Sequence, residues 1–308
     1  MISIVICSTK PRITAALQKN IEETVGVPFE IIEMDNSKNN YSIFSAYNEG
    51  VARSKYDLIC FIHEDILFHT SNWGIKIVTH LSDPLTGIIG VCGCTTILKI
   101  PSPWSLYDPS MYILQSTPSR QKQKLKQSGF DLNSAKKEVI AVDGVFMCAK
   151  KELFQKISFD EASFKGYHSY DIDICLQAHM AGYKNYSVND VLIEHFSKGS
   201  HNLGWINNSL MLSDKWSAQL PISLNPVSSE MLVKTEYKYM TVNFAKYMIR
   251  AGFSNAECTR TITKYLQHHE HSESKGFVRN IYFKILLVRL YKKPLTFFYP
   301  FNKKPLNV

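Results

Sequence analysis

The stretch Leu58-Ile59-Cys60-Phe61-Ile62-His63-Glu64-Asp65 decides the fold predicted for this chain. A short apolar run ends abruptly in three polar side chains. Such runs are typical of strands buried on both faces of a parallel sheet. In open α/β sheets, ligands bind just beyond the carboxyl ends of the strands. His63 and Asp65 stand two apart and share one face of an extended chain, which predicts a divalent-metal site. The alternative is a solvated turn in which Asp65 caps the next element.

The segments before this stretch extend the same pattern. Ile2–Cys7 and Pro28–Met34 have the composition of strands, while Ile13–Val25 and Tyr41–Ser54 have helical periodicity. With Leu58–Ile62, the order is strand, helix, strand, helix, strand, which is typical of a parallel sheet with helical crossovers. We therefore predict an α/β fold with a Rossmann-like, mostly parallel sheet flanked by helices. All three strands end in polar clusters that should meet at one edge.

Two common phosphate-binding motifs are absent from the sequence. No Gly-x-Gly-x-x-Gly follows the first strand, which argues against an ordinary dinucleotide-binding domain. No Gly-x-x-x-x-Gly-Lys occurs either. Phosphate would have to be bound in another way, and a metal ion at Asp65 would serve.

The rest of the chain divides into three parts. Residues 95–137 contain several prolines and a Lys/Arg run, and we expect a long insertion with one hairpin that acts as a lid. Order returns with strands around Asp143-Gly144, a helix opened by Asp171, and a short strand ending in Glu194-His195. Residues 1–204 are thus predicted to form the catalytic domain and 205–308 an α-helical C-terminal appendage.

Composition and charge limit the class of protein. The 308 residues carry a formal charge of +8, and from 276 onward there are basic residues but no acidic one. This tail has three interpretations: it packs on the catalytic domain, lies on the anionic face of a membrane, or makes a dimer. Nucleic-acid binding is not expected, because no recognised motif accompanies the charge.

The same survey bears on localisation. The seven cysteines are scattered, mostly in apolar runs, and we expect reduced thiols in a cytoplasmic protein. The start of the sequence has no charged-then-apolar leader, so no signal peptide is expected. No apolar stretch is long enough to predict a spanning helix.

Taken together, several motifs resemble one family. In chain order they are Ile4-Val5-Ile6-Cys7-Ser8-Thr9, Glu33-Met34-Asp35-Asn36-Ser37, Ala46-Tyr47-Asn48-Glu49-Gly50, His63-Glu64-Asp65, Val142-Asp143-Gly144-Val145-Phe146, Gly166-Tyr167-His168-Ser169-Tyr170-Asp171-Ile172-Asp173 and Ile193-Glu194-His195-Phe196. This ordered set, across about residues 1–200, resembles the family-2-like glycosyltransferases of the GT-A fold. It looks most like the bacterial subgroup with His-x-Asp in place of Asp-x-Asp.

The resemblance implies a nucleotide-diphosphate sugar donor, a divalent cation and inversion at the anomeric carbon. By position, Asp65 and His195 would bind the metal, and Asp171 would be the general base. The donor side would comprise Ser8, Thr9, Asp35, Asn36, Asn48, His63 and Glu64. The acceptor side would comprise Asp143, Gly144 and Tyr170. Tyr170 stands where many members carry Glu, so Asp173 is the alternative base.

The chemistry of these residue types is consistent with such a reaction. A cation bridging the phosphates would stabilise the charge of the departing diphosphate. Asp oxygen suits Mn²⁺ or Mg²⁺, and imidazole favours Mn²⁺. An attacking hydroxyl needs a carboxylate to take its proton. Asp171 or Asp173 could equally be an N-cap of the helix they open.

The prediction is a metal-dependent glycosyltransferase acting on a saccharide or lipid-linked acceptor in bacterial surface polysaccharide or lipopolysaccharide synthesis. It would work in the cytoplasm, with the region 276–308 as a contact to the inner face of the membrane. One alternative is a sugar nucleotidyltransferase, but the turn after the first strand lacks the glycines such enzymes carry. The other is a non-catalytic carbohydrate- or partner-binding module, which would be marked by loss of the metal or base residues.

Overall fold

Strands β1 (Ile2–Ser8), β2 (Phe29–Asp35) and β3 (Leu58–Ile62) lie side by side and parallel in the computed structural model. They form one side of a seven-stranded sheet with the order β10-β13-β5-β12-β3-β1-β2. Ser8 pairs with Asp35 at the carboxyl end of β1, so the predicted polar ends meet at one edge. The predicted order of strands and helices is confirmed. The structure describes residues 1–116, 123–131, 134–197, 199–269, 272 and 274–291.

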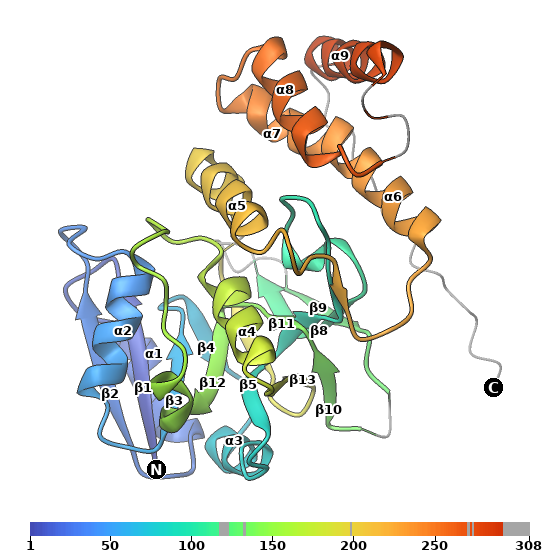
Figure 1. Cartoon of the computed structure of the whole chain (residues 1–308). Helices are drawn as coiled ribbons and strands as arrows, with labels where there is room; N and C mark the ends of the chain where they lie inside the picture. The colour runs from blue at the N-terminus through green and yellow to red at the C-terminus, as the bar shows by residue number, and fades with distance from the viewer. Residues whose placement is uncertain (117–122, 132–133, 198, 270–271, 273, 292–308) are drawn as a thin grey trace. The chain divides into compact units, whose positions relative to one another are not determined.

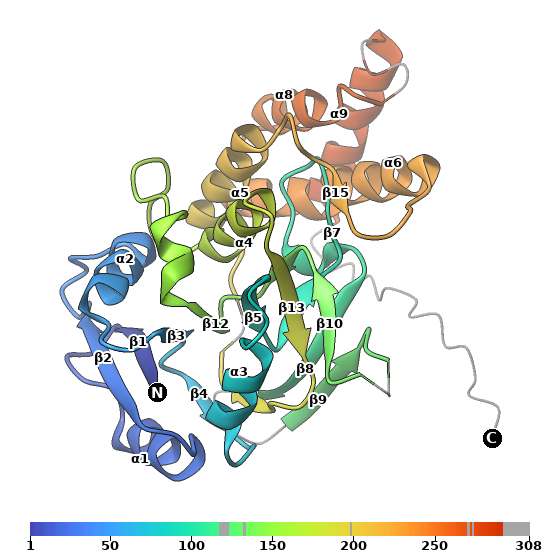
Figure 2. The ribbon, with the colours of Figure 1, turned by 60° about the horizontal axis from the view of Figure 1, so that its bottom comes forward.

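Helices cover both faces of this sheet (Figures 1 and 2). One core joins Val5, Ile59 and Phe61 to α2 (Ile43–Arg53) and α4 (Tyr170–Met180). The other joins Ile4, Cys60 and Ile62 to α1 (Ala15–Thr24) and α3 (Trp73–His80). Alternate residues of each strand therefore enter opposite cores, which is why the strands are apolar throughout. The predicted α/β class is confirmed.

The remaining strands make the sheet mixed. They are β5 (Thr86–Gly90), β10 (Lys136–Val139), β12 (Phe146–Lys150) and β13 (Lys184–Val188). Strand β12 runs antiparallel between β3 and β5, and β10 runs antiparallel to β13, whereas β13 is parallel to β5. A 3₁₀ turn (Lys151–Gln155) follows β12.

The expectation that all thiols are reduced is wrong at one pair. Cys60 on β3 and Cys148 on β12 are directly opposite each other and form a disulfide, with Cα atoms 4.2 Å apart. The sequence could not show this, because the two residues become neighbours only through the antiparallel pairing of their strands. The other five cysteines are free.

A second sheet, in the order β11-β6-β8-β14-β4, takes up part of the predicted insertion. Its strands are β4 (Ile66–Phe68), β6 (Cys92–Cys94), β8 (Pro109–Ser116), β11 (Ala141–Val142) and β14 (Ile193–His195). A further strand, β9 (Gln123–Ser128), pairs with β8. The expected hairpin is thus β8–β9, but β8 lies inside the sheet and is not merely part of a lid. The basic run begins at residues 120–122, outside the described residues.

The smaller elements of this region are a 3₁₀ turn (Trp104–Leu106) and the strand pair β7 (Thr96–Ile97) and β15 (Ile222–Ser223). The C-terminal helices are α5 (Leu203–Lys215), α6 (Ser229–Lys238), a π-helical turn (Tyr239–Phe244), α7 (Ala245–Arg250), α8 (Asn255–Tyr265) and α9 (Lys275–Leu290).

By internal packing, the chain forms two units, Met1–Glu236 and Tyr237–Val308. Helix α5 therefore belongs with the sheets, and this division falls later than the change of character predicted at residue 204. Residues 292–308 of the predicted basic tail lie outside the described part. Within the described residues, no helix has the length and apolar character needed to cross a membrane.

Candidate active site

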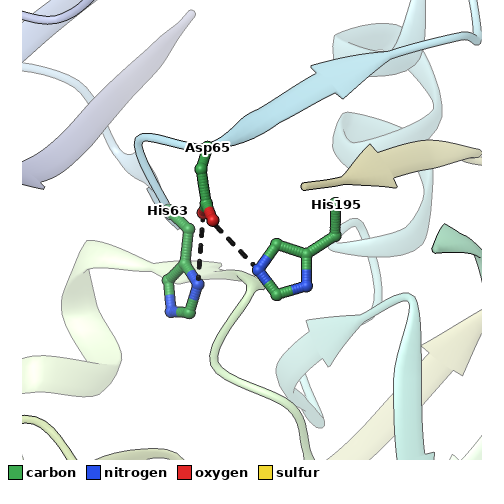
Figure 3. A group of neighbouring side chains, drawn as sticks. All are labelled: His63, Asp65 and His195. Carbon is green, nitrogen blue, oxygen red and sulfur yellow. Dashed lines mark ion pairs between the residues drawn. The ribbon is translucent and has the colours of Figure 1, made fainter. Parts of the chain in front are cut away.

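His63, Asp65 and His195 gather at the carboxyl end of β3 (Figure 3). The Asp65 Oδ1 atom lies 3.9 Å from His63 Nδ1 and 3.5 Å from His195 Nε2. One ligand atom from each residue lies within 4.8 Å of the others. All three side chains are half-buried, so they are held by the fold and remain open to a ligand.

Strand pairing brings these residues together. His63 and Asp65 stand in the turn between β3 and β4, and β14 pairs antiparallel with β4 so that His195 is opposite Ile66. The backbone N–H of Phe196 donates to the carbonyl oxygen of Asp65 at 3.0 Å, which extends the pairing of β14 with β4 as far as Asp65. A residue remote in sequence thereby completes the group.

The local electrostatics suit cation binding. Burial opposes ionisation of Asp65, but the neighbouring His195 and Ser197 hold its pKa at about 2. Burial and then the neighbouring His195 lower the pKa of His63, which keeps that imidazole neutral. Its other nitrogen, Nε2, lies 2.9 Å from the Tyr170 hydroxyl, a contact that orients the ring. Neutral imidazole and ionised carboxylate are the forms that bind metals.

The donor set also fits a divalent ion by size. Ligand atoms bound at about 2.1 Å from one ion are separated by roughly 3–4 Å. The separations of 3.5 and 3.9 Å between the Asp65 oxygen and the two imidazole nitrogens lie in this range and exceed normal hydrogen-bond lengths. His63, Asp65 and His195 would therefore hold a metal with small side-chain adjustments.

Asp171 lies in the first turn of α4 beside the Asp143-Gly144 turn. Its Oδ2 atom accepts a hydrogen bond from Gly144 N at 3.1 Å, and its Oδ1 atom accepts one from Ile172 N at 2.9 Å. A Cβ on Gly144 would overlap the hydroxyl of Tyr170, so only glycine permits this approach. Tyr170, the chain neighbour of Asp171, thus lies against this turn and also contacts His63 of the metal-capable group.

The pKa of Asp171 is raised to about 7, first by burial and second by the negative charge of Asp143. The helix N-terminus favours the ionised form, but burial and repulsion outweigh the helix dipole and the two N–H donors. A carboxyl with a pKa near neutrality is suited to accept and release a proton.

Asp173, the alternative base, has a different environment. It is 1% exposed, and Lys215 Nζ lies 2.8 Å from its Oδ1 atom. Trp216 Nε1 donates to Oδ1 at 2.8 Å and Gln177 Nε2 to Oδ2 at 2.8 Å. Its oxygens are thus occupied by groups that join α4 to α5. Neither aspartate is the N-cap of α4, a position held by Ser169.

The loop before α4 is held in an unusual conformation. Ser169 has a φ of 68°, in the left-handed region that non-glycine residues rarely adopt. From α5, Asn208 Nδ2 donates to the carbonyl oxygens of Lys165 at 2.7 Å and His168 at 2.8 Å. Helix α5 therefore supports the loop that presents Tyr170 and Asp171.

Ser8, Thr9 and Glu64 from the predicted donor side form one cluster. Glu64 Oε2 accepts from Ser8 Oγ at 2.5 Å, and Oε1 accepts from Thr9 N at 3.1 Å and Thr9 Oγ1 at 2.5 Å. Asp35 is exposed next to Ser8 at the end of β2. Hydrogen bonds from Ser37 lower the pKa of Asp35, so it is an anionic acceptor at neutral pH.

Two other donor-side residues have their side chains engaged within the protein. Asn36 is buried, and its amide bonds to both backbone groups of Tyr41 and to the hydroxyl of Tyr167. Asn48 on α2 bonds in the same two-sided way to the backbone of Phe159, at 2.8 and 3.0 Å. These contacts shape loops, and a role of either residue in donor binding stays a prediction.

Three contributors were not found from the sequence. Trp104 Nε1 donates to Asp143 Oδ2 at 2.7 Å, so the predicted insertion does reach the site. Gln115 Nε2 donates to the carbonyl oxygen of His195 at 3.0 Å, and Asn208 supports the α4 loop. None lies in a motif, and the only available signal was that long insertions often serve a nearby site.

Comparisons with known proteins agree with this architecture. Residues 3–201 match the model of a family described as "Glycosyltransferase like family". No curated protein matches the chain. Among solved structures, GalNAc-T7 with UDP, GalNAc and Mn²⁺ has a TM-score of 0.51 at 12% identity, over 96% of this chain and 58% of that one. The mannosyltransferase PcManGT from Pyrobaculum calidifontis has a TM-score of 0.46 at 13% identity, over 95% of this chain and 87% of that one.

The fold is of the GT-A type, as the likeness to the GalNAc-T7 structure shows. The chain belongs to the glycosyltransferase-like family whose model covers residues 3–201.

Proposed function

We propose that the chain is an inverting, divalent-cation-dependent enzyme that transfers a sugar from a nucleotide-diphosphate donor to a saccharide or lipid-linked acceptor. The observation that carries the proposal is the convergence of two groups at one sheet edge. His63, Asp65 and His195 form a metal-capable set, and Tyr170, which contacts His63, directly precedes Asp171 in the first turn of α4. The GalNAc-T7 structure, whose fold this chain shares, contains UDP and Mn²⁺.

Each group has a distinct part in this proposal. Mn²⁺ or Mg²⁺, when bound, would neutralise the diphosphate and so stabilise the charge of the leaving group. Asp35 and the Ser8–Thr9 turn would bind the nucleoside, with Glu64 fixing that turn. Asp171 would take the proton of the acceptor hydroxyl as it attacks the anomeric carbon from the face opposite the diphosphate.

The acceptor side lies where the insertion meets α4. Asp143, held by Trp104 Nε1 and by Val145 N at 2.8 Å, forms a wall next to Asp171. Its charge also makes Asp171 a stronger proton acceptor. We place the enzyme in the cytoplasm, in the synthesis of bacterial surface polysaccharide or lipopolysaccharide, on the strength of the motif resemblance.

A thermal-shift screen tests the donor site. UDP, GDP, ADP, CDP and dTDP are added with and without Mn²⁺ to the wild type, to Asp65→Ala and to the control Glu23→Ala, an exposed carboxylate on α1. A ligand at about 100 times its dissociation constant stabilises by about 2.7 kcal/mol, which gives a clear rise in melting temperature.

We expect one nucleotide to stabilise the wild type and Glu23→Ala only when Mn²⁺ is present, and Asp65→Ala not at all. A response to no nucleotide in well-folded protein would overturn the proposal and favour a binding module without transferase activity.

A further inference from the structure

Helix α9 exposes apolar side chains on the face that turns away from its own unit. Ile281 and Ile285 are fully buried, and α9 packs against α7 and α8. On the opposite side Phe283 is 58% exposed, Leu287 37% and Leu290 76%. The spacing of four and then three residues places these side chains in one row along the helix. Single exposed apolar residues are ordinary, but an exposed row marks an interaction surface.

Two cations adjoin this row. Lys275 and Arg279 are exposed and form no ion pair within the described residues. With Thr259, Val278 and Tyr282 they line a depression of about 410 Å³. Arg279 stands four residues before Phe283, so the cationic depression continues directly into the apolar row. A site of this kind offers positive charge to an anionic group and an apolar surface beside it.

The other two cations of α9 are engaged within its own unit. Arg289 donates to Asn255 Oδ1 and to the carbonyl oxygen of Phe253, each at 2.7 Å. Lys284 Nζ lies 4.5 Å from the centre of the Tyr237 ring. This contrast separates structural cations from the two that remain available. No acidic residue occurs from 275 to the end of the sequence.

We propose that this α9 face, defined by Lys275, Arg279, Phe283, Leu287 and Leu290, docks on an anionic lipid bilayer. The helix would lie in the plane of the interface, with the cations at lipid phosphates and the apolar row in the boundary between headgroups and acyl chains. Tyr282, 40% exposed beside the row, has the amphipathic ring that suits this level.

Charge and composition favour this occupant over two others. A second copy of the chain would bring like cations together, with no acidic residue on α9 to pair with them. Nucleic acid would use the cations but would have no contact for Leu287 and Leu290. Only a surface that is anionic and also apolar matches both halves of the face. The proposal does not depend on transferase activity, although a lipid-linked acceptor would give it a purpose.

Vesicle co-sedimentation of the full chain tests it. Phosphatidylcholine vesicles, with and without phosphatidylglycerol, are mixed with wild type, with Lys275→Gln/Arg279→Gln and with Phe283→Ser/Leu290→Ser. Lys19→Gln/Lys55→Gln and Leu85→Ser are matched controls, since these residues are similarly exposed in the other unit. Near-ultraviolet circular dichroism confirms that every variant is folded.

We expect binding only to the anionic vesicles and no change in either control. Each surface cation contributes roughly a fivefold factor, so the double Gln variant should bind on the order of 30-fold more weakly. Phe283→Ser/Leu290→Ser should abolish the binding that persists when salt is raised, because apolar insertion is not screened. Inorganic phosphate at moderate concentration should not compete.

Other outcomes would overturn the proposal. Equal binding by wild type and both α9 variants would remove the α9 face from any membrane contact. A dimer in sedimentation velocity that Phe283→Ser/Leu290→Ser converts to monomer, without vesicle binding, would assign the face to a second copy. Stronger binding to an oligonucleotide that depends on the cations but not on Phe283 would assign it to nucleic acid.

Discussion

The same substitution at two positions of α4 would decide which carboxylate is the base. Asp171→Asn and Asp173→Asn each remove one negative charge and keep the size of the side chain. The two residues are two apart in the first turns of the helix, but they face different surroundings. One touches the Asp143-Gly144 turn, and the other is buried against Lys215 and Trp216.

Activity should fall at Asp171 and not at Asp173. A positioned general base accelerates a reaction by about 10²–10⁴-fold, so Asp171→Asn should lose a factor in this range. Asp173 has its oxygens engaged by Trp216, Gln177 and Lys215. Its replacement should therefore leave the rate within about tenfold of wild type.

Stability should respond in the opposite order. Since the pKa of Asp171 is raised to about 7, the folded protein binds this proton more tightly than the unfolded chain, and stability is lost as pH rises from about 4 to about 7. Above pH 7, the Asp171→Asn variant avoids that loss of stability. This gain is reduced by about 1 kcal/mol, because the amide has one acceptor oxygen for the two N–H donors of Gly144 and Ile172. Its unfolding free energy should thus be close to wild type or higher.

Asp173→Asn should destabilise the protein. Breaking a buried ion pair costs about 3–5 kcal/mol when the remaining charge has no partner. Lys215 is 29% exposed and keeps Asp160 at 2.8 Å, so a loss of about 1–3 kcal/mol is expected. Urea unfolding at pH 8 gives these differences, and release of nucleoside diphosphate from the sugar nucleotide gives the rates. A folded Asp173→Asn that loses activity about 10³-fold, beside an active Asp171→Asn, would refute the assignment of Asp171 as the base.

Three further predictions concern the same site. The kcat/KM of the wild type should rise with pH and level off above a pKa of about 7, because Asp171 must be ionised to act as base; a flat profile from about pH 5 to 8 would contradict this. Tyr170→Phe should weaken Mn²⁺ binding about 10-fold or more in calorimetric titration, because His63 loses its orienting contact, whereas unchanged affinity would argue against this role. Gly144→Ala should lower stability by about 1–3 kcal/mol in urea, since the new methyl group overlaps the Tyr170 hydroxyl, and wild-type stability would show that the turn can shift.

Much of the first sheet could be predicted because its signals are local. The apolar runs of β1, β2 and β3 and the periodicity of α1 and α2 depend on neighbouring residues, and the structure places these elements where the pattern predicts them. The helix opened near Asp171 follows the same rule. The second sheet was less accessible, because β6, β8 and β14 are short and acquire their identity from pairing with distant strands.

The residues of the candidate site likewise divide into those predictable from local sequence and those placed only by tertiary structure. His63 and Asp65 were paired by their spacing alone, since two residues at alternate positions must share a face. Only strand pairing could place His195 opposite Ile66, and only packing could bring Trp104 to Asp143 or join Cys60 to Cys148.

The sequence alone determined the class of the protein: the order of its elements, the polar strand ends and the motifs that name the family. The tertiary structure alone decided the chemistry of individual residues. Asp171 and Asp173 are the same residue type in the same helix, yet Asp171 lies beside Asp143 with a raised pKa and Asp173 forms an ion pair with Lys215. The reason is that a local pattern specifies secondary structure, whereas burial and charge at an atom depend on groups that the chain brings together only when folded.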